Sequence, residues 1–109
     1  MAHTLAKVGR PFAVGNKICQ IATVNVTSYT SGGEVINVAD IGFSQVDAVF
    51  ISAVQDMTTR DYTIECEEDG TLTSSSTFSI TSVDLDGTNA QTSAATDIGM
   101  VRLMIMGSR

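Results

Sequence analysis

The sequence predicts an all-β fold: a small β-sandwich or jelly-roll-like barrel with one short helical turn. The chain has 109 residues, of which 43% are apolar, enough for one domain with its own core. It is rich in Ser, Thr and Val and contains one Pro and no Trp, a composition that favours strands and turns over long helices. Short alternating segments are separated by turn residues, which is the spacing of a sandwich or barrel.

Six strands are expected, at residues 18–27, 46–54, 60–67, 71–73, 77–85 and 100–106. In the first, Ala22, Val24 and Val26 share one face, because successive side chains of a strand point to opposite faces. Residues 46–54 are apolar on both faces, so this strand is predicted to be central in its sheet, with neighbours covering both sides. Asp69-Gly70 predicts a hairpin turn.

Turn residues predict the connections. Gly32-Gly33 permits backbone angles closed to other residues and predicts a sharp reversal. Asn37 can cap one helical turn that ends at Gly42, with Asp40 near the start of that turn. Residues 88–97 have small side chains and little periodicity, so they are expected to form an exposed loop or a short helical excursion.

Charge is unevenly distributed along the chain. The net charge is -6 and the isoelectric point is near 4.4, which argues against tight binding to nucleic acid phosphates. Residues 1–17 contain three cations and no acid, whereas residues 18–109 contain all twelve acids. We therefore expect an extended N-terminal arm over residues 1–17 and a β-sandwich domain over residues 18–109.

The residues of the expected arm are suited to docking on a neighbouring subunit. Pro11 favours an extended backbone, and Phe12 and Val14 beside it can anchor the arm on an acidic patch of a neighbouring subunit. A frayed terminus that happens to lack acids is the alternative interpretation.

The last predicted strand is apolar on both sides. Its Met-rich face is expected to pack on a second subunit, unless the strand is simply central within its own domain. Together with the arm, this face supplies the candidate interface residues: Lys7, Arg10, Pro11, Phe12, Val14, Met100, Arg102, Met104 and Met106.

No catalytic or metal-binding constellation is evident in the sequence. The single histidine, His3, lies in the expected arm and is predicted to be solvated, which leaves no nucleophile and base pair, so we expect no enzyme. Cys19 and Cys66 are too few for a zinc site; we expect reduced, buried thiols, with a disulfide as the alternative. The segment Asp84-Leu85-Asp86-Gly87-Thr88-Asn89 lacks the remaining ligands of a calcium loop and is predicted to be a solvated turn. No cofactor is expected.

No secretory leader and no run of about 20 apolar residues is evident, so we expect synthesis in the cytoplasm and no membrane contact. Nothing in the sequence indicates a small-molecule substrate.

The order of elements in residues 15–43 resembles that of a family of small tailed-phage virion proteins. The shared features are the start Gly15-Asn16-Lys17, a strand, the turn Tyr29-Thr30-Ser31-Gly32-Gly33-Glu34, and the segment Ala39-Asp40-Ile41-Gly42-Phe43. The resemblance implies a capsid decoration (cement) protein on the outer surface of the virion head, with the major capsid protein as its partner, acting as a homotrimer. A tail, head-fibre or connector component and a glycan-binding β module remain as alternatives.

Overall fold

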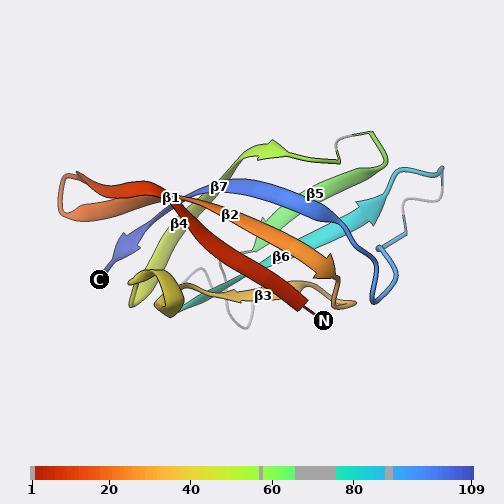
Figure 1. The fold of residues 1–109 in the computed structure, drawn as a ribbon, viewed down its shortest axis with the longest axis horizontal. Helices are drawn as coiled ribbons and strands as arrows, with labels where there is room; N and C mark the ends of the chain where they lie inside the picture. Colours follow the sequence, from red (N-terminus) through yellow and green to blue (C-terminus); the bar gives the residue numbers. More distant parts are fainter. Residues whose placement is uncertain (1, 57, 66–75, 88–89) are drawn as a thin grey trace.

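The computed structural model describes residues 2–56, 58–65, 76–87 and 90–109, and it is an all-β sandwich (Figure 1). Two antiparallel sheets face one another: a four-stranded sheet in the order β1-β2-β7-β4 and a three-stranded sheet in the order β3-β6-β5. The elements are β1 (Ala2–Val14), β2 (Lys17–Ser28), β3 (Glu34–Asn37), the 3-10 turn η1 (Val38–Ile41), β4 (Gln45–Val54), β5 (Arg60–Glu65), β6 (Thr77–Asp84) and β7 (Gly99–Ser108). The predicted fold class is confirmed.

The core lies between the sheets. The predicted inner face of β2, with Ala22, Val24 and Val26, is fully buried. It meets side chains from β7 on the same sheet and from β3 and β6 on the opposite sheet, including Val101, Leu103, Ile105, Ile36, Phe78 and Ile80. Strict alternation on β2, β6 and β7 therefore produces one shared apolar layer.

The expected arm is a strand of the domain. Ala2–Val14 pairs antiparallel with β2 as an edge strand, with an irregularity between Val8 and Phe12 where three residues of β1 are accommodated. A two-residue turn at Gly15-Asn16 joins the two strands, and Gly15 has φ +63, as a type II′ hairpin requires. The described part of residues 1–17 thus lies within the sandwich, which differs from an arm outside it.

The strand predicted to be central, residues 46–54, is instead an edge strand. Among the described residues β4 pairs with β7 alone, whereas β7 lies between β2 and β4. Apolar residues on both faces of this segment suggested a central position. That inference assumed that apolar side chains on either face of the strand are covered, whereas Phe50 on the outer face is 52% exposed. Strand order is set by which segments pair over long sequence distances, and the local pattern does not encode this.

The turn predictions hold where they are described. The side chain of Asn37 accepts a hydrogen bond from the Ala39 N–H at 3.0 Å, and Gly42 ends η1 with φ +92. The reversal at Gly32-Gly33 is confirmed, with both glycines at positive φ. Residues 90–97 contain no helix.

Two further predicted segments are described only in part. Residues 66–67, the Asp69-Gly70 turn and the strand expected at 71–73 lie outside the described residues. The chain after residue 89 is not an isolated loop, because Gln91 bridges to Val83, and Thr92 donates its N–H to the Ser82 carbonyl at 2.9 Å.

Close approach of β4 and β7 depends on Gly107. A Cβ atom at this position would lie 2.0 Å from the Gln45 carbonyl oxygen. We expect Gly107→Ala to lower the free energy of unfolding by about 2 kcal/mol or more, because the two backbones must separate. Denaturant unfolding measures the change. Ser108→Ala, at the neighbouring half-buried position, is the control and should change it by less than about 0.5 kcal/mol; an equal loss in both variants would contradict the argument.

Candidate interaction surface

The face of the four-stranded sheet that points away from the core, here called the outer face, carries two rows of apolar side chains. The strand register aligns Val8, Ile21, Met104 and Phe50 in one row. It aligns Phe12, Cys19, Met106 and Ala48 in the next. Each row crosses all four strands, because directly opposed residues of antiparallel neighbours share a face. We call these eight residues the apolar rows.

Three residues of the apolar rows are exposed to solvent, four are partly buried (Ile21, Ala48, Met104 and Met106), and Cys19 is buried. Val8 is 41% exposed, Phe12 47% and Phe50 52%, while Met100, further along the same face, is 44% exposed. Single exposed apolar side chains are ordinary, whereas several exposed apolar side chains grouped on one face make that face a candidate interaction site.

The outer face of the three-stranded sheet is different. The register places mostly polar side chains there, with Val35 and Val83 among them: Asn37, Asp61, Thr63, Glu65, Thr77, Ser79 and Thr81. The three-stranded sheet therefore has the mostly polar outer face expected of an antiparallel sheet. The outer face of the four-stranded sheet instead carries the apolar rows beside a polar part with Thr4, Thr23, Asn25 and Arg102. The apolar rows are thus a feature of one particular face.

The structure brings several predicted interface residues together. Phe12, Met104 and Met106 belong to the apolar rows, and Arg102 and Met100 follow on the same outer face. Val14, on the same side, lies at the hairpin end, opposite Lys17. Packing of the Met-rich face on a second subunit is untested, while the alternative, that the strand is central in its own sheet, is the arrangement observed.

Other predicted interface residues lie elsewhere. Lys7 and Pro11 line a hollow of about 220 Å³ together with Ile18, Ile41, Phe43 and Arg109, away from the apolar rows. Arg10 is exposed within the irregular stretch of β1. Sequence reasoning missed Val8, Ile21, Ala48 and Phe50. Alternation could place the last three within their predicted strands, but Val8 lay in the expected arm, and which strands are neighbours was not known.

Charge is segregated between the two sheets. The strands of the four-stranded sheet carry Lys7, Arg10, Lys17 and Arg102 against the single acid Asp47, a sum of 4 - 1 = +3. Lys17 and Asp47 form an ion pair at 2.7 Å. The strands of the other sheet carry four acids, Glu34, Asp61, Glu65 and Asp84, against Arg60, a sum of 1 - 4 = -3. The four-stranded sheet, which carries the apolar rows, is thus net basic, and the three-stranded sheet packed against it is net acidic.

His3 is not in a solvated terminus, contrary to the sequence-based prediction. Its Nδ1 lies 2.5 Å from Oε2 of Glu34, so the contact joins β1 of one sheet to β3 of the other. The other carboxylate oxygen of Glu34 accepts the Thr30 N–H at 3.0 Å. Burial raises the pKa of the Glu34 carboxyl group, but the hydrogen bonds from His3 and Thr30 outweigh it and hold this pKa below its ordinary value.

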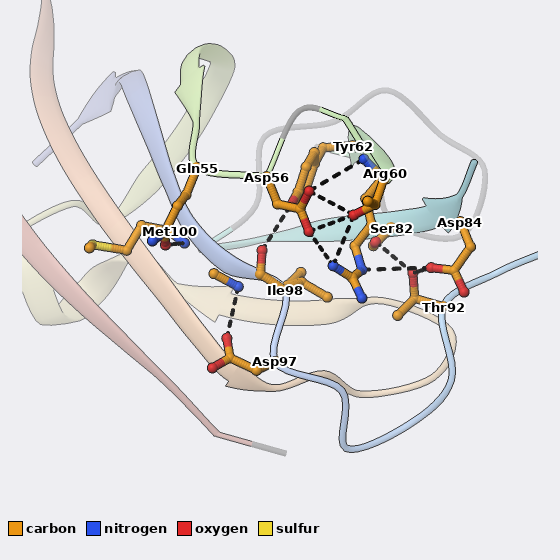
Figure 2. Close-up of polar contacts among 12 residues, drawn as sticks. Gln55, Asp56, Arg60, Tyr62, Ser82, Asp84, Thr92, Asp97, Ile98 and Met100 are labelled. Atoms are coloured by element: carbon orange, nitrogen blue, oxygen red, sulfur yellow. Dashed lines mark hydrogen bonds and ion pairs between the residues drawn. The ribbon is translucent and has the colours of Figure 1, made fainter. Parts of the chain in front are cut away.

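A second polar cluster lies around β5, at the opposite edge of the three-stranded sheet from β3 (Figure 2). Arg60 forms ion pairs with Asp56 and, at 3.6 Å, with Asp84. Hydrogen bonds from the Thr59 hydroxyl, with smaller contributions from its N–H and from Arg60, hold the pKa of Asp56 below its ordinary value despite some desolvation. Within this group the acids accept hydrogen bonds from neighbouring residues, as in a structural clamp.

Tyr62, Ser82 and Thr92 extend that cluster inward (Figure 2). The Tyr62 hydroxyl donates to the Ile98 carbonyl at 2.7 Å, and burial raises the pKa of Tyr62. The hydroxyls of Ser82 and Thr92 are 2.6 Å apart, and Thr92 donates to Asp84 at 2.8 Å. These bonds fix the segment before β7 against β5 and β6.

Other candidate chemistry is sparse in the described ranges. No three His, Cys, Asp or Glu side chains gather there in a metal-binding arrangement. Of the weak calcium motif, Asn89 lies outside the described residues, as does Cys66, while Cys19 is a buried free thiol within the apolar rows. The described chain also holds no helix with the length and apolarity to cross a bilayer.

The Glu34 contact predicts an acid-dependent stability. The folded-state pKa of Glu34 is lowered, so the unfolded chain binds this proton more tightly, and the stabilisation is present above the ordinary value of 4.5 and lost as pH falls through the folded value. We expect Glu34→Gln to lower the unfolding free energy by about 2 kcal/mol at neutral pH, with a smaller difference at pH 3. Urea titrations at several pH values measure it. Val35→Thr, at the neighbouring exposed position of β3, is the control and should leave the pH dependence of stability unchanged.

The chain was compared with known proteins in three ways. No family model matches it, no curated protein matches it, and no solved structure matches it.

Proposed function

We propose that this chain is a non-enzymatic structural protein of a tailed-phage virion, a capsid decoration protein that binds the outer surface of the head and bridges major capsid protein subunits. The observation that carries the proposal is the pair of apolar rows on one outer face of the sandwich, with Val8, Phe12 and Phe50 exposed; the other outer face has no such rows. The resemblance of residues 15–43 to small virion proteins supplies the identity of the partner.

The apolar rows provide the binding free energy in this proposal. Burying a side chain such as Phe12 or Phe50 contributes about 1.5–3 kcal/mol relative to leaving it exposed, and both are about half exposed in the free chain. The side chains project from a hydrogen-bonded sheet, so little conformational entropy is lost when a partner covers them. Contacts across a joint between capsid subunits would oppose their separation.

Charge orients the molecule on the shell. Arg102 and Arg10 are exposed on the four-stranded sheet, and a partner surface with carboxylates around an apolar centre would complement them. The acidic three-stranded sheet then faces the medium. In this arrangement the protein is made in the host cytoplasm and resides on the virion exterior, away from the packaged nucleic acid.

Substitution on the outer face tests the proposal. We expect Met104→Lys to weaken binding to heads that lack the protein by about tenfold or more, because a charge replaces a thioether at the centre of the apolar rows. Sedimentation of heads with bound protein measures occupancy. The control is Thr81→Lys, on the polar outer face of the three-stranded sheet, which should bind as the unmodified chain does.

Equal binding by both variants would refute the outer face as the docking surface, and absence of any binding to heads would refute the decoration role. Deleting residues 1–17 is a poor test, because it removes β1 and exposes the edge of β2.

A further inference from the structure

The sequence of β4 and the next residue reads nearly the same in both directions about Phe50. From the centre outward, Val49 matches Ile51, Ala48 matches Ser52, Val46 matches Val54 and Gln45 matches Gln55. Asp47 and Ala53 are the one dissimilar pair. An antiparallel strand paired with a copy of itself about a two-fold axis at Phe50 would bring each residue opposite its match.

Within the described chain, the edge of β4 away from β7 has no strand neighbour. Among the described residues only β7 pairs with β4. Register irregularities flank the stretch Ala48–Ile51, between Val46 and Ala48 and between Ile51 and Ala53, which leaves this central stretch regular. Regular unpaired strand edges are templates for another strand.

The other edge of the same sheet is protected. There β1 carries Lys7, Arg10 and Pro11, and its pairing is interrupted between Val8 and Phe12. Cations and proline are among the features by which proteins block edge pairing. By contrast β4, although it has two register irregularities, contains neither Lys, Arg nor Pro, and its one charge, Asp47, is paired with Lys17. The difference indicates which edge accepts a strand.

The side-chain faces agree with the two-fold register. Directly opposed residues of an antiparallel pair share a face. Val49 and Ile51 both pack toward the core, and Val46 and Val54 both pair with core-facing positions of β7. On the outer face Phe50 would meet Phe50 of the second copy. No position would bring two like charges together, because Asp47 would face Ala53.

We propose that two copies of this chain associate through β4, antiparallel and centred on Phe50, into one continuous eight-stranded sheet. The pairing gives β4 a strand neighbour on that edge and joins the row of Val8, Ile21, Met104 and Phe50 in one copy to the same row in the other. The outer faces of both copies then form one larger apolar surface. The proposal does not depend on the capsid role, and its dimer differs from the trimer that the resemblance implies.

Mass in solution tests the association. Sedimentation equilibrium of the full chain over a concentration series should give twice the chain mass of 11.5 kDa. Phe50→Lys and Phe50→Glu should each be monomeric, because like charges would oppose one another at the axis, and an equimolar mixture of the two should recover the dimer. Phe12→Lys, on the same face but at the β1 edge, is the matched control and should remain dimeric.

Cross-linking tests the register. In a Cys66→Ser background, Phe50→Cys should form a disulfide-linked dimer on mild oxidation, since opposed Cβ atoms lie about 4.5–5.5 Å apart. Ala53→Cys, also exposed on β4, should not, because the two copies of that position would be about 20 Å apart. Asp47→Cys mixed with Ala53→Cys should cross-link.

A monomer at every concentration, a trimer, or a dimer insensitive to charge at Phe50 would overturn the proposal. Cross-linking through Ala53→Cys alone would overturn the register. None of these measurements uses virus particles, so failure to bind heads refutes the proposed function and leaves this association standing.

Discussion

The insertion of β7 between β2 and β4 is the interaction on which the rest of the structure depends. It joins β7 to two strands from the first half of the chain, in continuous register over Ile18–Val26 of β2 and with two register shifts over Gln45–Val54 of β4. Its inner side chains, Val101, Leu103 and Ile105, are fully buried at the centre of the core. Its outer side chains complete the apolar rows. One strand thus supplies both the core and the middle of the proposed docking surface.

Two polar clamps hold the sheets together around that core. At one end His3 and Glu34 link β1 to β3. Near Glu34 in the sequence, the buried Tyr29 hydroxyl accepts the Ser82 N–H at 3.1 Å. The Tyr29 N–H donates to the Thr96 carbonyl, and the Tyr29 carbonyl accepts the Ala95 N–H. At the opposite edge of the three-stranded sheet, Arg60 lies between Asp56 and Asp84. These contacts satisfy most of the buried and half-buried polar atoms involved and fix how the sheets align.

The two outward faces of the sandwich have different chemistry. A polar, acidic face needs no cover, whereas the apolar rows leave large side chains such as Phe12 and Phe50 about half exposed. A domain of this size has little apolar surface to spare beyond its core. Placing aromatic and thioether groups outside the core therefore sacrifices solubility, which is consistent with a protein whose working state is assembled. The edge strand β4, which contains no Lys, Arg or Pro, belongs to that same sheet.

The sequence alone determined the local features: the all-β class, five of the strands to within a few residues, the Asn37-capped turn and the reversal at Gly32-Gly33. Each rests on alternation or on backbone angles, which are properties of adjacent residues. It also picked out Phe12, Met104 and Met106 as surface residues of one kind. Tertiary structure decided that β1 is a strand, that β4 lies at an edge, and that His3 meets Glu34. These outcomes depend on which distant segments pair. The stability of a strand depends on its cross-strand neighbours, and the local sequence pattern does not identify those neighbours.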